Sequence, residues 1–191
     1  MTKTGILSGS FNPIHIGHLA LANWICEYGG MDEVWFLVTP QNPLKDKKGL
    51  IDDHLRLTLV QKAIGSYPKF KVSDIEFSLP QPSYTIDTLA ALTKRFPQNM
   101  FHLIMGADNW NIIDKWKDAD KLLTTYPVLV YPRIGYSINI PLSYPLTQKI
   151  DAPIIEISST FIRESLKLNK DVRFFIPDNI HGYLEAIQKQ L

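Results

Sequence analysis

The chain has 191 residues, of which 45% are hydrophobic and 20% charged, a balance typical of a globular domain with a substantial core. The formal net charge of +1 argues against a polybasic surface that binds nucleic acid. Cys26 is the only cysteine, which excludes an intrachain disulfide, and no apolar run approaches the roughly 18 residues of a membrane span. We therefore expect a cytoplasmic protein that binds neither nucleic acid nor a membrane.

Apolar runs alternate with amphipathic stretches along the chain, the pattern of a parallel sheet with helices on both faces. We predict strands at Thr4–Leu7, Val34–Val38, Lys71–Asp74, Phe101–Met105, Val128–Tyr131 and Ile154–Ile157. We predict helices at Gly17–Tyr28, Asp53–Ile64, Thr85–Phe96, Asp114–Leu123, Ser159–Leu168 and Pro177–Gln190. This order favours one Rossmann-like, doubly wound α/β domain over residues 1–191, with a small C-terminal helical part from about residue 158.

Several of these helices have recognisable start signals. The candidate capping residues are Asp52 or Asp53, Ser83 and Ser158. Pro177 is a proline in the first turn of the last predicted helix. The stretch Pro132–Pro153 carries four prolines and many small polar residues, so we expect it to be an excursion over the surface.

The loop after the first predicted strand carries the clearest sign of chemistry. It reads GSFNPIHIGH and places His15 and His18 where the first helix would begin. A helix start presents free N–H groups and a positive dipole end, which bind anions, and two imidazoles would add donors. Gly9 and Gly17 would let the backbone approach a ligand closely. We expect a nucleotide phosphate site here; the alternatives are histidines that only cap and pack, and a metal pair without further ligands at an obvious spacing.

A second anion site is predicted near the C-terminus, where the sequence reads ISSTFIRE. The hydroxyls of Ser158, Ser159 and Thr160 stand at a predicted helix start, and Arg163 follows on the first turn. The alternative is an ordinary helix cap followed by a solvated arginine. Triphosphate chemistry needs donors from more than one side of the charge, which favours pairing this segment with the histidine loop.

Two further segments are candidates for holding a nucleotide. Gly106 ends a predicted strand and would permit close approach of a base or sugar, while Asp108 could accept hydrogen bonds from ribose hydroxyls or cap a helix. The segment SYTIDTL at residues 83–89 and the pair Trp116-Lys117 indicate, as bare sequence, an amphipathic helix and an aromatic packing residue.

Taken together, these motifs resemble a known family. H-x-G-H with the preceding G-x-F-x-P, and S-S-T-x-I-R, are similar to the H-x-G-H nucleotidyltransferase superfamily. The G-A-D-N and S-Y-T-x-D-T-L elements resemble its nicotinate (nicotinamide) mononucleotide adenylyltransferase family, and the resemblance runs almost from end to end. The letters HIGH also occur in class I aminoacyl-tRNA synthetases, but a KMSKS-like motif and an anticodon-binding region are missing from this sequence.

The resemblance implies adenylyl transfer from ATP to nicotinate mononucleotide, which releases pyrophosphate. It implies catalytic roles for His15, His18 and Arg163. It implies ATP binding by Gly9, Ser10, Phe11, Gly17, Gly106, Asp108, Ser158, Ser159 and Thr160. It implies mononucleotide binding by Asn42, Lys45, Lys47, Tyr84, Thr85, Trp116 and Lys117. Mg²⁺ would arrive with ATP and be held mainly by phosphates, without a metal site of protein ligands.

The sequence leaves several alternatives open. Many family members have Asp where this chain has Asn12, so a negative charge is absent there. The rival enzyme is a phosphopantetheine or other small-molecule adenylyl- or cytidylyltransferase of the superfamily, and the rival from another class is a non-catalytic nucleotide sensor. The layout resembles the bacterial nicotinate-preferring branch, yet residues 45–50 also resemble the lysine-rich loop of dual-specific enzymes. The oligomeric state, monomer or homo-oligomer, is left open.

Overall fold

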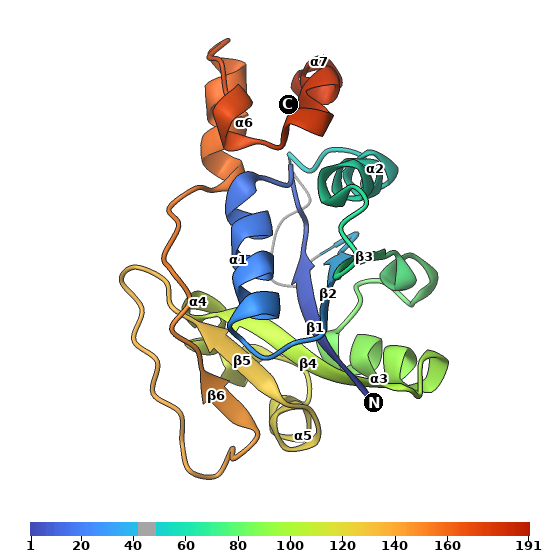
Figure 1. Cartoon of the computed structure of the whole chain (residues 1–191), viewed down its shortest axis with the longest axis vertical. Helices are drawn as coiled ribbons and strands as arrows, with labels where there is room; N and C mark the ends of the chain where they lie inside the picture. Colours follow the sequence, from blue (N-terminus) through green and yellow to red (C-terminus); the bar gives the residue numbers. More distant parts are fainter. Residues whose placement is uncertain (42–48) are drawn as a thin grey trace.

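The computed structural model describes residues 1–41 and 49–191, and its centre is a six-stranded sheet (Figure 1). The strand order is β3-β2-β1-β4-β5-β6, and each neighbouring pair is parallel. The strands are β1 (Thr2–Gly9), β2 (Glu33–Val38), β3 (Phe70–Ser73), β4 (Asn99–Gly106), β5 (Val128–Tyr131) and β6 (Thr147–Lys149). This is the order of doubly wound nucleotide-binding sheets, so the predicted fold class is confirmed.

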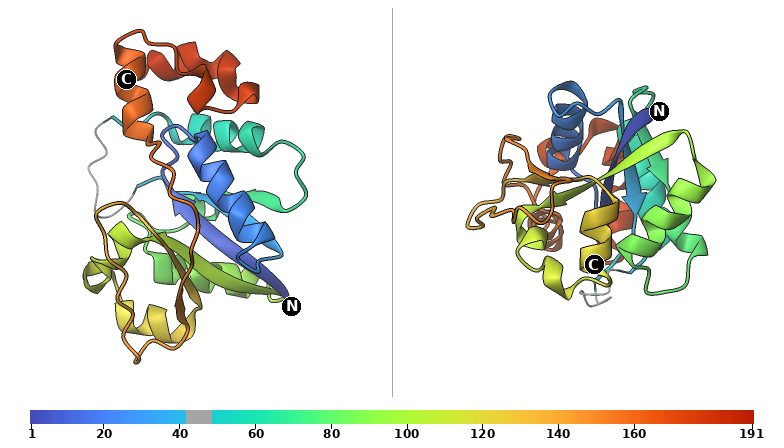
Figure 2. Two further views of the ribbon diagram at one scale, coloured as in Figure 1. Left: turned by 60° about the vertical axis from the view of Figure 1, so that its left-hand side comes forward. Right: turned by 90° about the horizontal axis from the view of Figure 1, so that it is seen from below.

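Helices cover both faces of this sheet (Figures 1 and 2). The α-helices are α1 (Ile16–Glu27), α2 (Asp53–Ile64), α3 (Thr85–Arg95), α4 (Ala107–Trp110), α5 (Ala119–Thr125), α6 (Ser159–Lys167) and α7 (Leu184–Gln188). Short 3-10 helices are η1 (Ile75–Ser78), η2 (Ile113–Lys115), η3 (Arg173–Phe175) and η4 (Asp178–Tyr183). The core on one face contains residues from α1, α2 and the C-terminal helices, and the core on the other contains residues from α3, α4 and α5.

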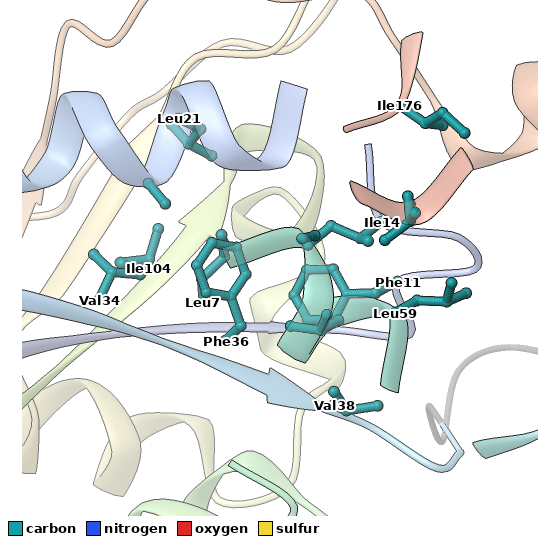
Figure 3. Packing of buried hydrophobic residues seen from close by; sticks show 14 of the residues in the cluster. Leu7, Phe11, Ile14, Leu21, Val34, Phe36, Val38, Leu59, Ile104 and Ile176 are labelled. Atoms are coloured by element: carbon teal, nitrogen blue, oxygen red, sulfur yellow. The ribbon is translucent and has the colours of Figure 1, made fainter. Parts of the chain in front are cut away.

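The alternation of side chains along each strand builds these two cores. All six residues of β2 are buried, and Val34 and Phe36 join the α1 face while Trp35 and Leu37 join the α3 face. Figure 3 shows the first of these faces, with Leu21 of α1 pointing toward the sheet. A strand buried on both faces reads as a continuous apolar run, which is why these strands could be predicted.

The sixth strand is not where the sequence placed it. Residues Ile154–Ile157 form no strand, and the edge strand is Thr147–Lys149, inside the predicted surface excursion. Only Thr147 of this strand is buried, so the backbone pairing with β5 leaves no apolar signature in the sequence. The apolar side chains of Ile154, Ile155 and Ile157 instead line a cavity described below.

Two predicted helices are interrupted in the structure. The prediction at Asp114–Leu123 splits into η2 and α5, because Asp118 between them adopts a left-handed backbone conformation with φ of 50°. The prediction at Pro177–Gln190 splits into η4 and α7, with Pro177 as the residue before η4.

The predicted caps have different outcomes. Asp52 caps α2 by accepting from the Leu55 N–H, and Ser158 caps α6 by accepting from the Phe161 N–H. Ser83 does not cap α3, because the N-cap residue is Tyr84; the Ser83 hydroxyl donates to the carboxylate of Glu76. Among residues 1–41 and 49–191, no helix has both the length and the apolar character needed to cross a bilayer.

Arg56 of α2 holds together the backbone around the first strand-to-helix loop. Its side chain is fully buried. It pairs with Asp53 at 2.6 Å. Its guanidinium also donates to the carbonyls of Ser10, Thr39, Pro40 and Ile51. The loops that follow β1 and β2 are therefore tied to α2 by one side chain.

We predict that Arg56→Met lowers the free energy of unfolding by about 3 kcal/mol or more, because several buried carbonyls lose their donor. Urea denaturation of the variant and of wild type gives this difference directly. The exposed Arg95→Met is the matched control, with an expected change within about 0.5 kcal/mol. An equal stability of Arg56→Met and wild type would contradict the role of Arg56.

Candidate active site

A cavity of ≈ 550 Å³ opens at the carboxyl ends of the strands. His15 and His18 line it from the start of α1, and Arg163 lines it from α6. Asp108 lines it from the start of α4. Carboxyl ends of parallel strands are where doubly wound folds bind their ligands. The structure therefore brings the two predicted anion-binding segments to one place.

The start of α1 fixes the two imidazoles against each other. His15 is the N-cap residue of α1. Its ring stacks on that of His18 with centroids 3.6 Å apart, and its backbone N–H donates to His18 Nδ1 at 3.3 Å. A Cβ at Gly17 would lie 3.1 Å from His15 Nδ1, so glycine is what allows the ring to lie over this turn. The edge of Phe11 packs against His18 at a centroid distance of 5.0 Å.

Burial keeps both histidines uncharged at neutral pH. Burial, with a smaller effect from the charge of Arg133, lowers the pKa of His15 from 6.5 to about 4. Burial also lowers the pKa of His18, helped by His15 and Arg133. Neutral imidazole carries one N–H donor and one acceptor, so each ring can still donate to a phosphate oxygen.

The start of α6 is bound directly to the histidine loop. Arg163 donates to the carbonyl of Asn12 at 2.8 Å and to Thr160 Oγ1 at 3.2 Å. Ser159 Oγ donates to the carbonyl of Pro13 at 2.8 Å. A guanidinium has five N–H donors, so Arg163 keeps donors for a ligand in the cavity.

The side-chain amide of Asn12 both donates and accepts a hydrogen bond. Its Nδ2 donates to the carbonyl of Gly49 at 2.8 Å, and its Oδ1 accepts from the N–H of Ile51 at 3.1 Å. A carboxylate could accept from Ile51 but could not donate to Gly49. The asparagine therefore joins the histidine loop to the chain entering α2.

A third wall of the cavity comes from the ends of β4 and β5. Asp108 Oδ1 lies 3.6 Å from Arg133 Nε. Arg133 donates to the Tyr131 hydroxyl at 3.1 Å. A Cβ at Gly106 would lie 2.3 Å from Asp108 Oδ1, so only glycine leaves room for this arrangement. Sequence reasoning missed Tyr131 and Arg133; the available signal was their position at the carboxyl end of a predicted central strand.

A smaller cavity of ≈ 130 Å³ adjoins the first. The two cavities share the lining residues Ser8, Gly9, Ser10 and Asn109. The smaller one is also lined by Thr39, Glu76, Ser83, Tyr84, Thr85, Trp116 and Lys117. Sequence reasoning did not place Thr39 or Glu76 here, because neither belongs to a pattern that points to a ligand.

An aromatic and cationic wall faces this smaller cavity. Trp116 presents an indole whose Nε1 is buried without a hydrogen-bond partner in the described part of the chain. Lys117 pairs with Asp87 at 2.9 Å, and its ammonium lies 4.8 Å from the centre of the Tyr84 ring. A flat aromatic ligand would find a stacking surface and polar donors here.

The predicted site residues thus fall into three groups. Those lining the larger cavity are Gly9, Ser10, Phe11, His15, Gly17, His18, Asp108, Ser158, Ser159, Thr160 and Arg163. Those lining the smaller cavity include Tyr84, Thr85, Trp116 and Lys117, while Gly106 lies beneath Asp108. Asn42, Lys45 and Lys47 lie outside the described residues.

Comparison with known proteins shows the family of the chain. The family model described as cytidylyltransferase-like matches residues 6–165. The chain belongs to this family. This chain is 56% identical over 175 residues to a probable nicotinate-nucleotide adenylyltransferase of Bacteroides fragilis. The alignment covers 92% of this chain and 87% of that protein. A protein of the same name from Azobacteroides pseudotrichonymphae is 51% identical over 179 residues, covering 93% and 94% of the two chains.

A solved structure shares this fold. The Plasmodium falciparum nicotinic acid mononucleotide adenylyltransferase complexed with NaAD aligns with a TM-score of 0.80 at 22% identity, covering 97% of this chain and 96% of that chain. Over residues 1–41 and 49–191, no three His, Cys, Asp or Glu side chains are grouped so that they could hold a metal ion.

We predict that His15 makes the stability of the protein fall on acidification. The unfolded chain takes up a proton near pH 6.5, whereas folded His15 does so only near pH 4, so the unfolded state binds more protons between these values. Wild type should therefore lose about 2 kcal/mol more than His15→Asn between pH 7 and pH 5.

Urea denaturation at the two pH values measures this difference. The variant His54→Asn, at an exposed position on α2, is the control and should follow wild type. An identical pH dependence in wild type and His15→Asn would show that burial does not suppress the charge of His15.

Proposed function

We propose that the protein transfers the adenylyl group of ATP to nicotinate mononucleotide, which forms deamido-NAD and pyrophosphate in NAD biosynthesis. The observation that carries this proposal is the shared cavity of His18 and Arg163, next to a smaller cavity walled by Trp116. The names of relatives up to 56% identical support the same reaction, and solved neighbours with this fold are complexes with NaAD and with APC.

In this reaction one phosphorus–oxygen bond forms and another breaks. A 5′-phosphate oxygen of the mononucleotide attacks the α-phosphorus of ATP, and the bond from that phosphorus to the bridging oxygen of the β-phosphate breaks. The attacking oxygen is already anionic at neutral pH, so the protein needs no general base. Catalysis then depends on positioning and on stabilising the charge that builds up on the phosphates.

The larger cavity supplies donors for that charge from two sides. His18 donates to the oxygens of the α-phosphate, and His15 donates to the β- or γ-phosphate. Arg163 and the backbone N–H groups near Ser159 and Thr160 hold the departing pyrophosphate at the start of α6. Mg²⁺ would arrive with the ATP substrate and would neutralise part of the phosphate charge, since it retains water readily and needs few protein ligands.

The smaller cavity takes the pyridine ring. The indole of Trp116 stacks on the flat ring, and the N–H groups at the start of α3 receive its carboxylate beside Tyr84 and Thr85. Phosphopantetheine has no aromatic ring, so the aromatic wall favours the pyridine mononucleotide over that substrate.

We predict that His18→Ala lowers kcat roughly 10²–10³-fold while changing the KM of either substrate much less, because the lost donor acts mainly in the transition state. Steady-state assays of pyrophosphate release measure both constants. His54→Ala is the matched control, since His54 lines neither cavity. A His18→Ala enzyme within threefold of the wild-type kcat would contradict this role.

We predict that the wild-type enzyme uses nicotinate mononucleotide with a higher kcat/KM than nicotinamide mononucleotide and does not adenylylate phosphopantetheine. The N–H donors at the start of α3 match a carboxylate better than an amide. Parallel assays of the three acceptors with ATP decide this. Preference for phosphopantetheine would replace the proposal, and ATP binding without pyrophosphate release for any acceptor would indicate a nucleotide sensor.

A further inference from the structure

Glu76 is a buried carboxyl group that the mechanism above does not use. It lies in η1, is only 4% exposed and lines the smaller cavity. Within residues 1–41 and 49–191, none of the ion pairs involves Glu76. Burial raises its pKa accordingly. Because burying a carboxyl group without an ion partner is unfavourable, the bonds that Glu76 makes need an explanation.

Two hydroxyl groups at the start of α3 hold this carboxyl group. Ser83 Oγ donates to Glu76 Oε2 at 2.8 Å. Thr88 Oγ1 shares its one proton between Glu76 Oε1 at 2.9 Å and the Tyr84 carbonyl at 3.1 Å. Ser83 precedes the N-cap residue Tyr84, and Thr88 lies at the end of the first turn. The Gln81 side-chain amide also donates to the backbone carbonyl of Glu76 at 2.7 Å. Glu76 therefore fixes the segment that leads into α3.

The start of α3 has no side-chain cap. Its N-cap residue is Tyr84, which offers no capping hydrogen bond, and Ser83 before it donates to Glu76. The first N–H groups of a helix have no intrahelical partner. Those of Thr85 and Ile86 have no acceptor in the described part of the chain. Tyr84 and Thr85 both line the smaller cavity.

We propose that Glu76 is a positioning residue for the pyridine mononucleotide. By holding Ser83 and Thr88, it fixes the start of α3 in the position where the free N–H groups face the carboxylate of the ring. Glu76 touches no substrate atom and acts only through α3. This inference rests on the proposed function, because the ligand is the acceptor of that reaction.

The test compares Glu76→Ala and Glu76→Gln in the full chain. Calorimetric titration gives the Kd of nicotinate mononucleotide, and steady-state assays give the KM of ATP. Glu76→Ala should weaken mononucleotide binding by roughly tenfold or more, the equivalent of a lost hydrogen bond or two. The KM of ATP should stay within about twofold of wild type, because α3 and the segment before it do not line the larger cavity. Glu76→Gln, which keeps an acceptor of the same shape, should retain most of the affinity.

A second variant tests the inference without changing Glu76. Ser83→Ala with Thr88→Val removes both hydroxyls and should weaken mononucleotide binding as Glu76→Ala does, which keeps the test decisive if Glu76→Ala fails to fold. Thr93→Val is the matched control, since the Thr93 hydroxyl donates only to the Leu89 carbonyl of α3 at 2.8 Å.

Unchanged mononucleotide binding in a folded Glu76→Ala protein or in the double variant overturns the inference, and so does an equal rise in the KM of ATP. Failure of wild type to form deamido-NAD would overturn the proposed function instead, and the titrations would still report on Glu76.

Discussion

The hydrogen bonds between α6 and the loop before α1 are the constraint on which the site depends. Arg163 and Asn12 are 151 positions apart in the chain, yet the guanidinium lies 2.8 Å from the Asn12 carbonyl. Ser159 makes the parallel contact to Pro13. Each helix start alone would be an ordinary weak anion site. Joined in this way, the two enclose one volume from opposite sides, which is what a polyphosphate requires.

The charges of this volume are divided between fixed cations and neutral donors. Arg133 and Arg163 stay charged at any ordinary pH, whereas burial keeps His15 and His18 neutral. A bound triphosphate shifts this balance, because an anion beside an imidazole favours its protonated form. Bound phosphate therefore favours positive charge on the histidines, and at neutral pH without it two imidazolium charges are not added to those of Arg133 and Arg163.

The sequence could predict the parts of the molecule whose signal is local. Buried strands such as Val34–Val38 appear as apolar runs, and the helix starts that bind anions carry glycines, hydroxyls and histidines in recognisable order. The edge strand Thr147–Lys149 could not be predicted, since backbone pairing alone holds it in the sheet. Glu76 was missed for a related reason. Its position follows from the packing of segments distant in sequence, and a single polar residue does not reveal such packing.

The wall shared by the two cavities has a consequence for turnover. Ser8, Gly9, Ser10 and Asn109 border both spaces. On the proposed binding mode, the attacking and the attacked phosphate meet at this boundary. The dinucleotide that results is anchored at both ends, by the pyridine in one space and by the AMP half in the other. On this binding mode the dinucleotide must leave both spaces before both substrates can enter again, so its release is a step that the shared wall affects as well as bond formation.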